Sequence, residues 1–222
     1  MDADTREPTT LETAWPLFRL RLRSEHLVLR LPTDDDLPAF IDLALAGIHP
    51  PDEMPFGVAW SVVPSPEFER GFVQHHWGLR ATWKPEAWTL NLMAEIEGRP
   101  VGTQSIGAVD FAIHRTVDTG SWLGRAFQGR GLGKEMRSAV LTLAFDGLGA
   151  RVAESSAFPD NLASSGVSRA LGYRDNGIGA LAPQGVSRET QRFRMTVDDW
   201  KSRPRPPVEI DGLEACRGLF GA

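Results

Sequence analysis

Cysteine is almost absent from this sequence of 222 residues, which contains only Cys216. A single cysteine excludes an internal disulfide and a multi-cysteine metal site, and we expect no bound metal. Chains that need no disulfide suit a reducing compartment, so the cytoplasm is the expected location. The sequence also lacks an apolar run of about 18 residues, which excludes a membrane-spanning helix. Its acidic first residues, Met1 to Asp4, do not resemble a secretory signal peptide.

An excess of basic residues is also lacking. The chain has 24 Lys and Arg against 29 Asp and Glu, for a net charge of -5. Binding to nucleic acid without sequence preference requires a basic surface that displaces counterions. Nucleic acid is therefore not an expected partner. A small anionic ligand remains compatible, because a local cluster of positive charge matters more than the net charge.

The length fits one domain with extensions. Apolar residues make up 41% of the chain, which is enough for a buried core. We expect a mobile N-terminal extension over residues 1–14 and one domain over residues 15–200. Residues 201–222 form a tail with apolar residues at irregular spacing, and we expect it to pack on the domain or on a partner subunit of a homodimer or higher oligomer.

Hydrophobic periodicity predicts an alternation of strands and helices. Thr33, followed by three aspartates, is typical of a helix start, because a hydroxyl caps the helix and carboxylates favour its positive end. The predicted strands are residues 25–31, 88–96, 101–109, 116–123, 151–156, 173–182 and 191–196. The predicted helices are residues 33–46, 67–82, 134–148 and 162–171. Residues 47–66 contain five prolines and are predicted to be loop. This order indicates an α+β or mixed α/β fold.

The most informative segment is a turn with glycine at positions 129, 131 and 133, between a predicted strand and a predicted helix. Glycine allows the backbone to approach a ligand closely. The first N–H groups of a helix have no partner within it, and together with the helix dipole they bind anions. Arg125, Arg130 and Lys134 add positive charge nearby. The segment therefore predicts a site for a diphosphate.

Two common nucleotide-binding motifs do not fit this turn. A Walker motif requires Ser or Thr after Gly-Lys, whereas Glu135 follows Lys134, and the leading glycine is replaced by Gln128. A dinucleotide-binding Gly-x-Gly-x-x-Gly also fails, because Lys134 or Met136 occupies its last position. Residues 128–133 instead match [Gln/Arg]-x-x-Gly-x-[Gly/Ala]. A glycine turn without a ligand is the alternative that this motif alone leaves open.

That motif is the acyl-CoA signature of the GNAT superfamily, which residues 25–200 resemble. Residues 25–37 look like the opening of its RimJ/RimL-type branch, and Asn161, Ser164 and the Gly172-Tyr173 pair resemble a later helix of that branch. The resemblance implies the GNAT fold, with a mostly antiparallel twisted sheet of about seven strands flanked by helices. It also implies that strands four and five, residues 116–123 and 151–156, splay apart around the cofactor.

The resemblance implies acetyl-CoA, or another short acyl-CoA such as succinyl-CoA, as co-substrate. Arg115 or His49 could pair with a succinyl carboxylate. Asn161 has a second interpretation as a helix N-cap. The implied cofactor-binding residues are Trp122, Leu123, Gly124, Arg125, Gln128, Gly129, Arg130, Gly131, Leu132, Gly133, Lys134, Asn161 and Ser164.

Transfer to an amine requires a base that removes a proton, and an acid can protonate the leaving thiolate. Asp118 is the preferred base, ahead of Glu95, Asp110 and His114, and Ser121 is a candidate for orienting substrate or water. Many GNAT enzymes carry a tyrosine seven residues after the helix asparagine. Ser168 occupies that position here, so the identity of the acid is open, with Ser168 or water as the candidate. The only tyrosine, Tyr173, is expected to pack.

The proline-rich loop lies where relatives form the acceptor pocket. The residues expected to bind substrate are His49, Asp52, Glu53, Phe56 and Trp60, with a rigid surface loop as the alternative. The resulting hypothesis is an acyltransferase in which a primary amine attacks acyl-CoA directly. The amine is a protein N-terminus, a lysine or a small molecule. A CoA-binding regulatory module without turnover is the alternative.

Overall fold

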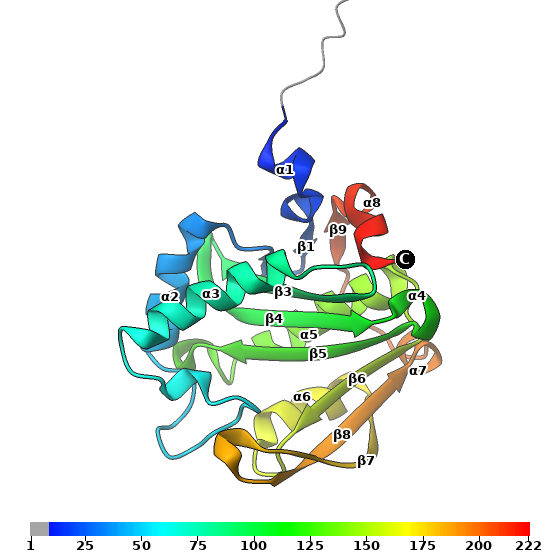
Figure 1. The fold of residues 1–222 in the computed structure, drawn as a ribbon. Helices are drawn as coiled ribbons and strands as arrows, with labels where there is room; N and C mark the ends of the chain where they lie inside the picture. Colours follow the sequence, from blue (N-terminus) through cyan, green and yellow to red (C-terminus); the bar gives the residue numbers. More distant parts are fainter. Residues whose placement is uncertain (1–8) are drawn as a thin grey trace, which may run out of the picture.

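The computed structural model describes residues 9–222, which form one sheet with helices on both faces (Figure 1). The nine strands follow the order β7-β8-β6-β5-β4-β3-β2-β1-β9, and every adjacent pair is antiparallel except β5 with β6. This mixed α/β architecture confirms the expected fold class. The strands are β1 (Arg21–Arg23), β2 (Val28–Arg30), β3 (Ala87–Ile96), β4 (Arg99–Val109), β5 (Thr116–Leu123), β6 (Val152–Ala157), β7 (Arg174–Leu181), β8 (Arg188–Thr196) and β9 (Glu209–Asp211).

Two pairs of longer helices cover the sheet. Figure 1 shows α3 in front of β3 and β4, in the view drawn, and α5 behind the sheet. No helix among residues 9–222 has the length and apolar character needed to cross a membrane. The helices are α1 (Leu11–Ala14), α2 (Leu37–Leu45), α3 (Glu67–Ala81), α4 (Phe111–His114), α5 (Leu132–Thr142), α6 (Leu162–Leu171), α7 (Val197–Lys201) and α8 (Leu213–Cys216).

The sheet has two more strands than the sequence predicted. Both missed strands, β1 and β9, are three residues long, too short to show an alternating pattern, and they pair with each other. The strand predicted over residues 25–31 shrinks to β2, because residues 24–27 form a turn in which the Ser24 N–H donates to the Leu27 carbonyl (2.9 Å). The predicted helix over residues 134–148 begins at Leu132 and ends as a π-helical turn over Leu143–Gly147.

β5 and β6 pair over only three residues each. The parallel register joins Thr116–Asp118 to Val152–Glu154, and no pair follows Asp118 and Glu154. Along its other edge, β6 is paired antiparallel to β8 over its whole length, from Val152 to Ala157. The predicted separation of these two strands is therefore confirmed. Beyond Asp118, the edge of β5 that faces β6 carries backbone groups without a ladder partner.

The ends of the described chain lie against the same sheet. The indole N–H groups of Trp83 and Trp88 donate to the carbonyls of Leu219 and Phe220 (2.9 and 3.1 Å). With the β1–β9 pairing, these bonds hold residues 209–220 on the domain within the chain itself. The first eight residues of the expected mobile extension lie outside the described residues, whereas Leu11–Ala14 form α1.

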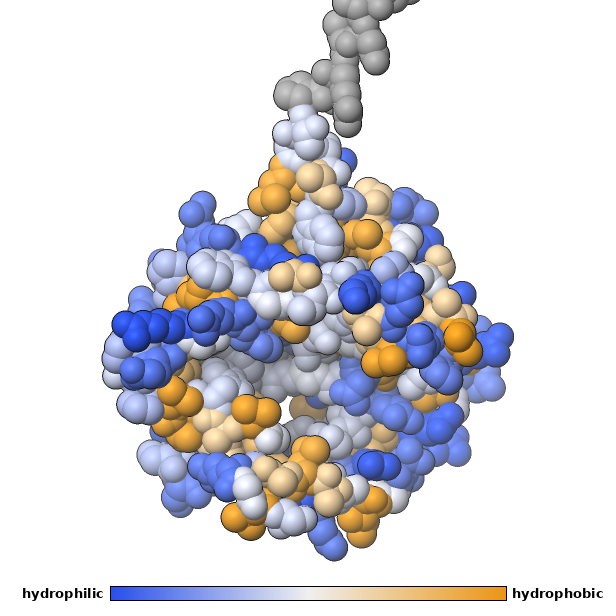
Figure 2. All heavy atoms as spheres, viewed as in Figure 1, coloured by the Kyte–Doolittle hydropathy of each residue, from blue (hydrophilic) through white to orange (hydrophobic). Residues whose placement is uncertain are grey.

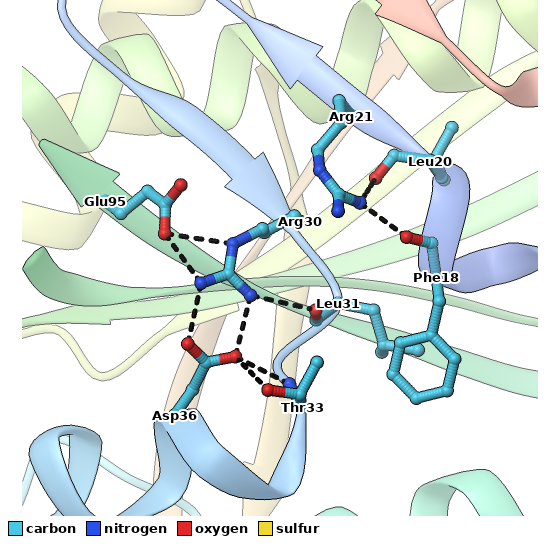
Figure 3. Close-up of polar contacts among 8 residues, drawn as sticks. All are labelled: Phe18, Leu20, Arg21, Arg30, Leu31, Thr33, Asp36 and Glu95. Carbon is cyan, nitrogen blue, oxygen red and sulfur yellow. Dashed lines mark hydrogen bonds and ion pairs between the residues drawn. The ribbon is translucent and has the colours of Figure 1, made fainter. Parts of the chain in front are cut away.

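A cluster of one arginine and two carboxylates fastens α2 to the sheet (Figure 3). Arg30 on β2 donates to both carboxylate oxygens of Asp36 (2.7 Å each) and to Glu95 on β3 (3.0 Å). Asp36 also accepts the N–H and hydroxyl of Thr33, which completes the predicted helix start. The hydrogen bonds from Arg30 lower the pKa of Asp36 to about 2.

We expect Arg30→Met to destabilise the protein by about 3 kcal/mol, because it leaves two mostly buried carboxylates without their partner. Urea unfolding at neutral pH measures this loss. Arg70→Met, at an exposed arginine of α3, is the matched control and should change little.

The same cluster predicts a pH dependence. Since the pKa of Asp36 lies below its ordinary value in the folded protein, its contribution is present above pH about 4 and is lost as the pH falls towards 2. The difference in stability between wild type and Arg30→Met should shrink over that window. A constant difference would contradict this account.

Candidate active site

The glycine turn forms an anion cradle at the start of α5. Gly129 and Gly131 have φ angles of 71° and 83°, which L side chains rarely adopt. Gly131 precedes the first helical residue, and the N–H groups of residues 129–133 donate to no acceptor within residues 9–222. These consecutive donors at the positive end of a helix can bind a diphosphate.

The charges around this cradle favour an anion. Arg125, Arg130 and Lys134 are exposed beside it, as the sequence predicted. The one acidic residue of the first helical turn, Glu135, accepts the N–H of His26 (2.8 Å) and lies 3.1 Å from its ring Nδ1. Those contacts lower the pKa of Glu135 although burial opposes the shift. Its carboxylate is thereby engaged with the β1–β2 turn.

Gln128 positions the cradle through its side chain. Its amide Nε2 donates to the carbonyls of Ile48 (2.6 Å) and Leu123 (2.8 Å). The neighbouring Arg125 N–H donates to the carbonyl of Gly47 (3.0 Å). These bonds tie the turn to the end of β5 and to the proline-rich loop, so the side chain of Gln128 holds protein groups in this structure.

The unpaired edge of β5 leads from the cradle into the gap between the strands. The ring of Trp122 stacks on Phe40 with centroids 5.2 Å apart, so this side chain packs against α2. The Gly124 N–H donates to Val101 on β4 (3.0 Å). A Cβ placed on Gly133 would lie 3.8 Å from Leu123, so the end of β5 adjoins the first turn of α5.

Asn161 caps α6. Its Oδ1 accepts the Ser164 N–H (3.0 Å), which is the N-cap interpretation of this residue. No further bond is made by its side-chain amide among residues 9–222, so that group can still meet a ligand. A Cβ on Gly133 would lie 3.6 Å from Val167 of α6, which places α6 beside the cradle.

Asp118 lies on the floor of a cleft of about 730 Å³ on the face of the sheet that α3 covers. Figure 2 shows this face hollowed at its centre, between the layer that contains α3 and strands β6 and β8. Water reaches the carboxylate, but the surrounding protein limits its hydration and raises its pKa to about 6. The Arg137 charge opposes this rise and the Glu154 charge adds to it. Asp118 can therefore accept a proton near neutral pH.

The two candidate serines differ in their exposure to solvent. Ser121 is exposed in the gap between β5 and β6. Ser168 is completely buried, and its Oγ has no hydrogen-bond partner. The structure therefore does not bring Ser168 to the surface of the cleft or the gap. Of the other bases considered, Glu95 belongs to the Arg30 cluster, Asp110 begins α4, and His114 lines the cleft.

The proline-rich loop does not line this cleft. The rings of Phe56 and Trp60 pack at a tilt with centroids 5.1 Å apart, and the centroids of Trp60 and Trp122 lie 5.8 Å apart. Both ring nitrogens of His49 have partners, Pro50 and Ser61. Asp52 and Glu53 are exposed. The loop therefore builds an aromatic wall beside β5, and its two carboxylates face solvent.

Several residues of the gap carry no signal in the sequence that marks them as part of the site. Arg137 lies within the apolar stripe of α5, where a charged residue is normally taken to face solvent, yet it is buried. Tyr173 packs as predicted, and its hydroxyl also lies 3.4 Å from Thr119 on β5. Glu154 and Ser155 share a short strand without a distinctive pattern. In the structure, every residue of α5 from Met136 to Thr142 is buried, so this part of the helix is enclosed on all sides. Arg137 is internal for that reason.

Comparison with known proteins places the chain in a family. Residues 26–174 match the family model of the acetyltransferase (GNAT) domain. Mycobacterium smegmatis RimJ, in complex with CoA-disulfide, has a TM-score of 0.66 at 21% identity, covering 90% of this chain and 92% of that one.

Two further solved structures share the fold. RimL, a ribosomal L7/L12 alpha-N-protein acetyltransferase in complex with coenzyme A, has a TM-score of 0.61 at 18% identity, covering 79% of this chain and 97% of that one. A GNAT-family acetyltransferase from Bacillus anthracis has a TM-score of 0.63 at 16% identity, with 80% and 99% covered. With a family model matched over residues 26–174, two strands that separate beside a glycine cradle, and these neighbours, the chain belongs to the GNAT acetyltransferase family.

Proposed function

We propose that this acyltransferase binds the diphosphate of acyl-CoA at the N–H groups of residues 129–133 and the thioester in the gap between β5 and β6. The observation that carries this proposal is the run of N–H groups at the start of α5 that have no acceptor among the residues described, 9–222. The adjoining unpaired edge of β5 supports it, because pantetheine amides can pair with such an edge. RimJ in complex with CoA-disulfide and RimL in complex with coenzyme A have the same fold, which also supports binding of this cofactor.

Acetyl-CoA is the proposed donor. A succinyl group would need a free cation near the thioester, and the two residues considered for this role have other partners. Arg115 lies over the ring of Phe111 (5.1 Å) and donates to the Leu148 carbonyl (3.3 Å). His49 is held by Pro50 and Ser61. Because Arg115 and His49 are engaged in these contacts, they do not favour binding of an acyl group that carries a carboxylate.

The proposed reaction is direct attack. The amine nitrogen bonds to the carbonyl carbon while Asp118 takes the amine proton, and the C–S bond then breaks with its electron pair remaining on sulfur. A base of pKa about 6 suits this role, because it is mostly ionised at neutral pH. Asp118 is the last β5 residue paired to β6, so it lies where the gap begins. This placement supports catalysis over a regulatory module without turnover.

The proposed acceptor is a protein amino group that enters through the cleft over Asp118. The residues lining this cleft include two carboxylates, Asp118 and Glu154, and no lysine or arginine. An acidic cleft attracts the ammonium form of an amine. RimL is described as an alpha-N-protein acetyltransferase, which supports a protein amine here.

The cradle is tested with Gly131→Glu, which places a carboxylate where the diphosphate binds. We expect CoA affinity, measured by titration calorimetry, to fall at least about tenfold. Gly98→Glu is the matched control, because Gly98 also has a positive φ angle (76°) and open space around its Cβ but lies in the β3–β4 turn. Equal CoA affinity of both variants would rule out the proposed cradle.

The base is tested with Asp118→Asn. We expect kcat to fall about 100-fold or more, with CoA affinity retained. Wild-type activity should rise with pH through about 6, because Asp118 must be ionised to accept a proton. Asp42→Asn, at an exposed aspartate of α2, is the control. Full activity of Asp118→Asn, with the same pH profile, would remove Asp118 from the mechanism.

A further inference from the structure

A buried arginine without a carboxylate partner lies behind the gap between β5 and β6. Arg137 belongs to α5, the helix that begins at the cradle, and its exposed fraction is 2%. No aspartate or glutamate among residues 9–222 lies within ion-pair distance of it. A buried, unpaired charge carries a large free-energy penalty unless an anion compensates it. The position therefore calls for a source of negative charge.

The guanidinium group spans the two diverging strands. Its Nη1 donates to Ser155 Oγ on β6 (3.1 Å), and its Nη2 to Ser121 Oγ on β5 (3.4 Å). Both serines lie beyond the last β5–β6 pair, Asp118 with Glu154. Its Nε–H has no hydrogen-bond partner in the described part of the chain. Since Ser121 is exposed in the gap, the guanidinium group lies directly beneath the surface that a bound thioester would occupy.

No carboxylate among residues 9–222 forms an ion pair with Arg137, although its charge acts on Asp118 through the sheet. The Tyr173 hydroxyl is the other polar group at this point, and burial raises its pKa, so it stays neutral. Strand alternation places Asp118 and Glu154 on the opposite face of the sheet from Ser121 and Ser155. Glu154 also has its own partner, Arg194, at 3.8 Å. His114 lines the cleft on that opposite face.

The reaction generates negative charge on sulfur, and the two hydroxyl groups considered as acids on this side, those of Ser168 and Tyr173, are buried and not exposed in the gap. When the C–S bond breaks, its electron pair stays on sulfur, and the amine proton has gone to Asp118. Ser168, which occupies the position of the expected acid, is sealed within the protein. A fixed positive charge beside the sulfur would stabilise the thiolate without any proton transfer.

We propose that Arg137 stabilises the departing CoA thiolate electrostatically, in place of protonation by a general acid. This inference rests on the proposed binding of acyl-CoA between β5 and β6. In this proposal the start of α5 and Arg137 on the same helix have different roles. The cradle binds the diphosphate of CoA, and Arg137 stabilises the negative charge that forms on its sulfur.

The test measures the pKa of the CoA thiol when CoA is bound to the intact protein, from the ultraviolet absorbance of the thiolate. In the wild type we expect this pKa to lie about 1–2 units below that of free CoA. In Arg137→Met it should return to the free value or rise above it, whereas Arg137→Lys should keep part of the shift. With acetyl-CoA and a saturating peptide amine, kcat of Arg137→Met should fall about 100-fold.

Ser155→Ala separates an electrostatic role from a structural one. This variant removes a hydrogen bond of the guanidinium group but keeps its charge, so the thiol pKa should stay depressed. A thiol pKa that rises as much in Ser155→Ala as in Arg137→Met would show that Arg137 only ties the strands together, and would overturn the proposal.

The thiol pKa of CoA bound to the wild type alone also tests the proposal. If Arg137→Met does not fold, an unshifted pKa of CoA bound to the wild type still overturns the proposal. The proposed function fails separately, through absence of CoA binding to the wild type. If CoA binds but the pKa of its thiol is not shifted, the proposed cradle stands and only the role of Arg137 is rejected.

Discussion

The site depends on the point at which β5 and β6 stop pairing. Parallel strands normally continue their ladder, because unpaired backbone groups inside a protein are costly. Here the ladder ends at Asp118 and Glu154, while β6 stays paired to β8 along its other edge through Ala157. The separation leaves a free strand edge on β5. In the proposed binding mode, this gap is the passage from the start of α5, behind the sheet, to the cleft in front of it.

The two sides of this passage carry opposite charge. Behind the sheet lie the free N–H groups at the start of α5, the exposed Arg130 and Lys134, and the buried Arg137. In front lie Asp118 and Glu154, in a cleft that is lined among residues 9–222 by one histidine, His114, but by no lysine or arginine. An anionic carrier and a cationic amine are therefore attracted to different faces of one sheet. Their reactive atoms can meet only where the strands have separated, which keeps the carrier and the acceptor from competing for one site.

The sequence predicted the parts of this arrangement that depend on local chemistry. The bounds of β5 and α6 follow from alternation, the Asn161 cap and Gly172, and the glycine turn indicates an anion site through backbone requirements alone. Residues whose roles depend on distant segments were not predictable. Arg137 is buried because α5 is enclosed on several sides, and β1 and β9 exist because the chain end returns to residues 21–23. Of the acceptor residues expected in the proline-rich loop, Phe56 and Trp60 pack towards β5, where Trp60 contacts Trp122, and their role in binding substrate stays a prediction.

The most direct measurement of the central claim is a crystal structure of the protein with coenzyme A bound. The account predicts the diphosphate within hydrogen-bond distance of the N–H groups of residues 129–133, and the sulfur between β5 and β6 near Ser121. Coenzyme A bound elsewhere, or bound at the cradle with its pantetheine arm outside the gap, would contradict it.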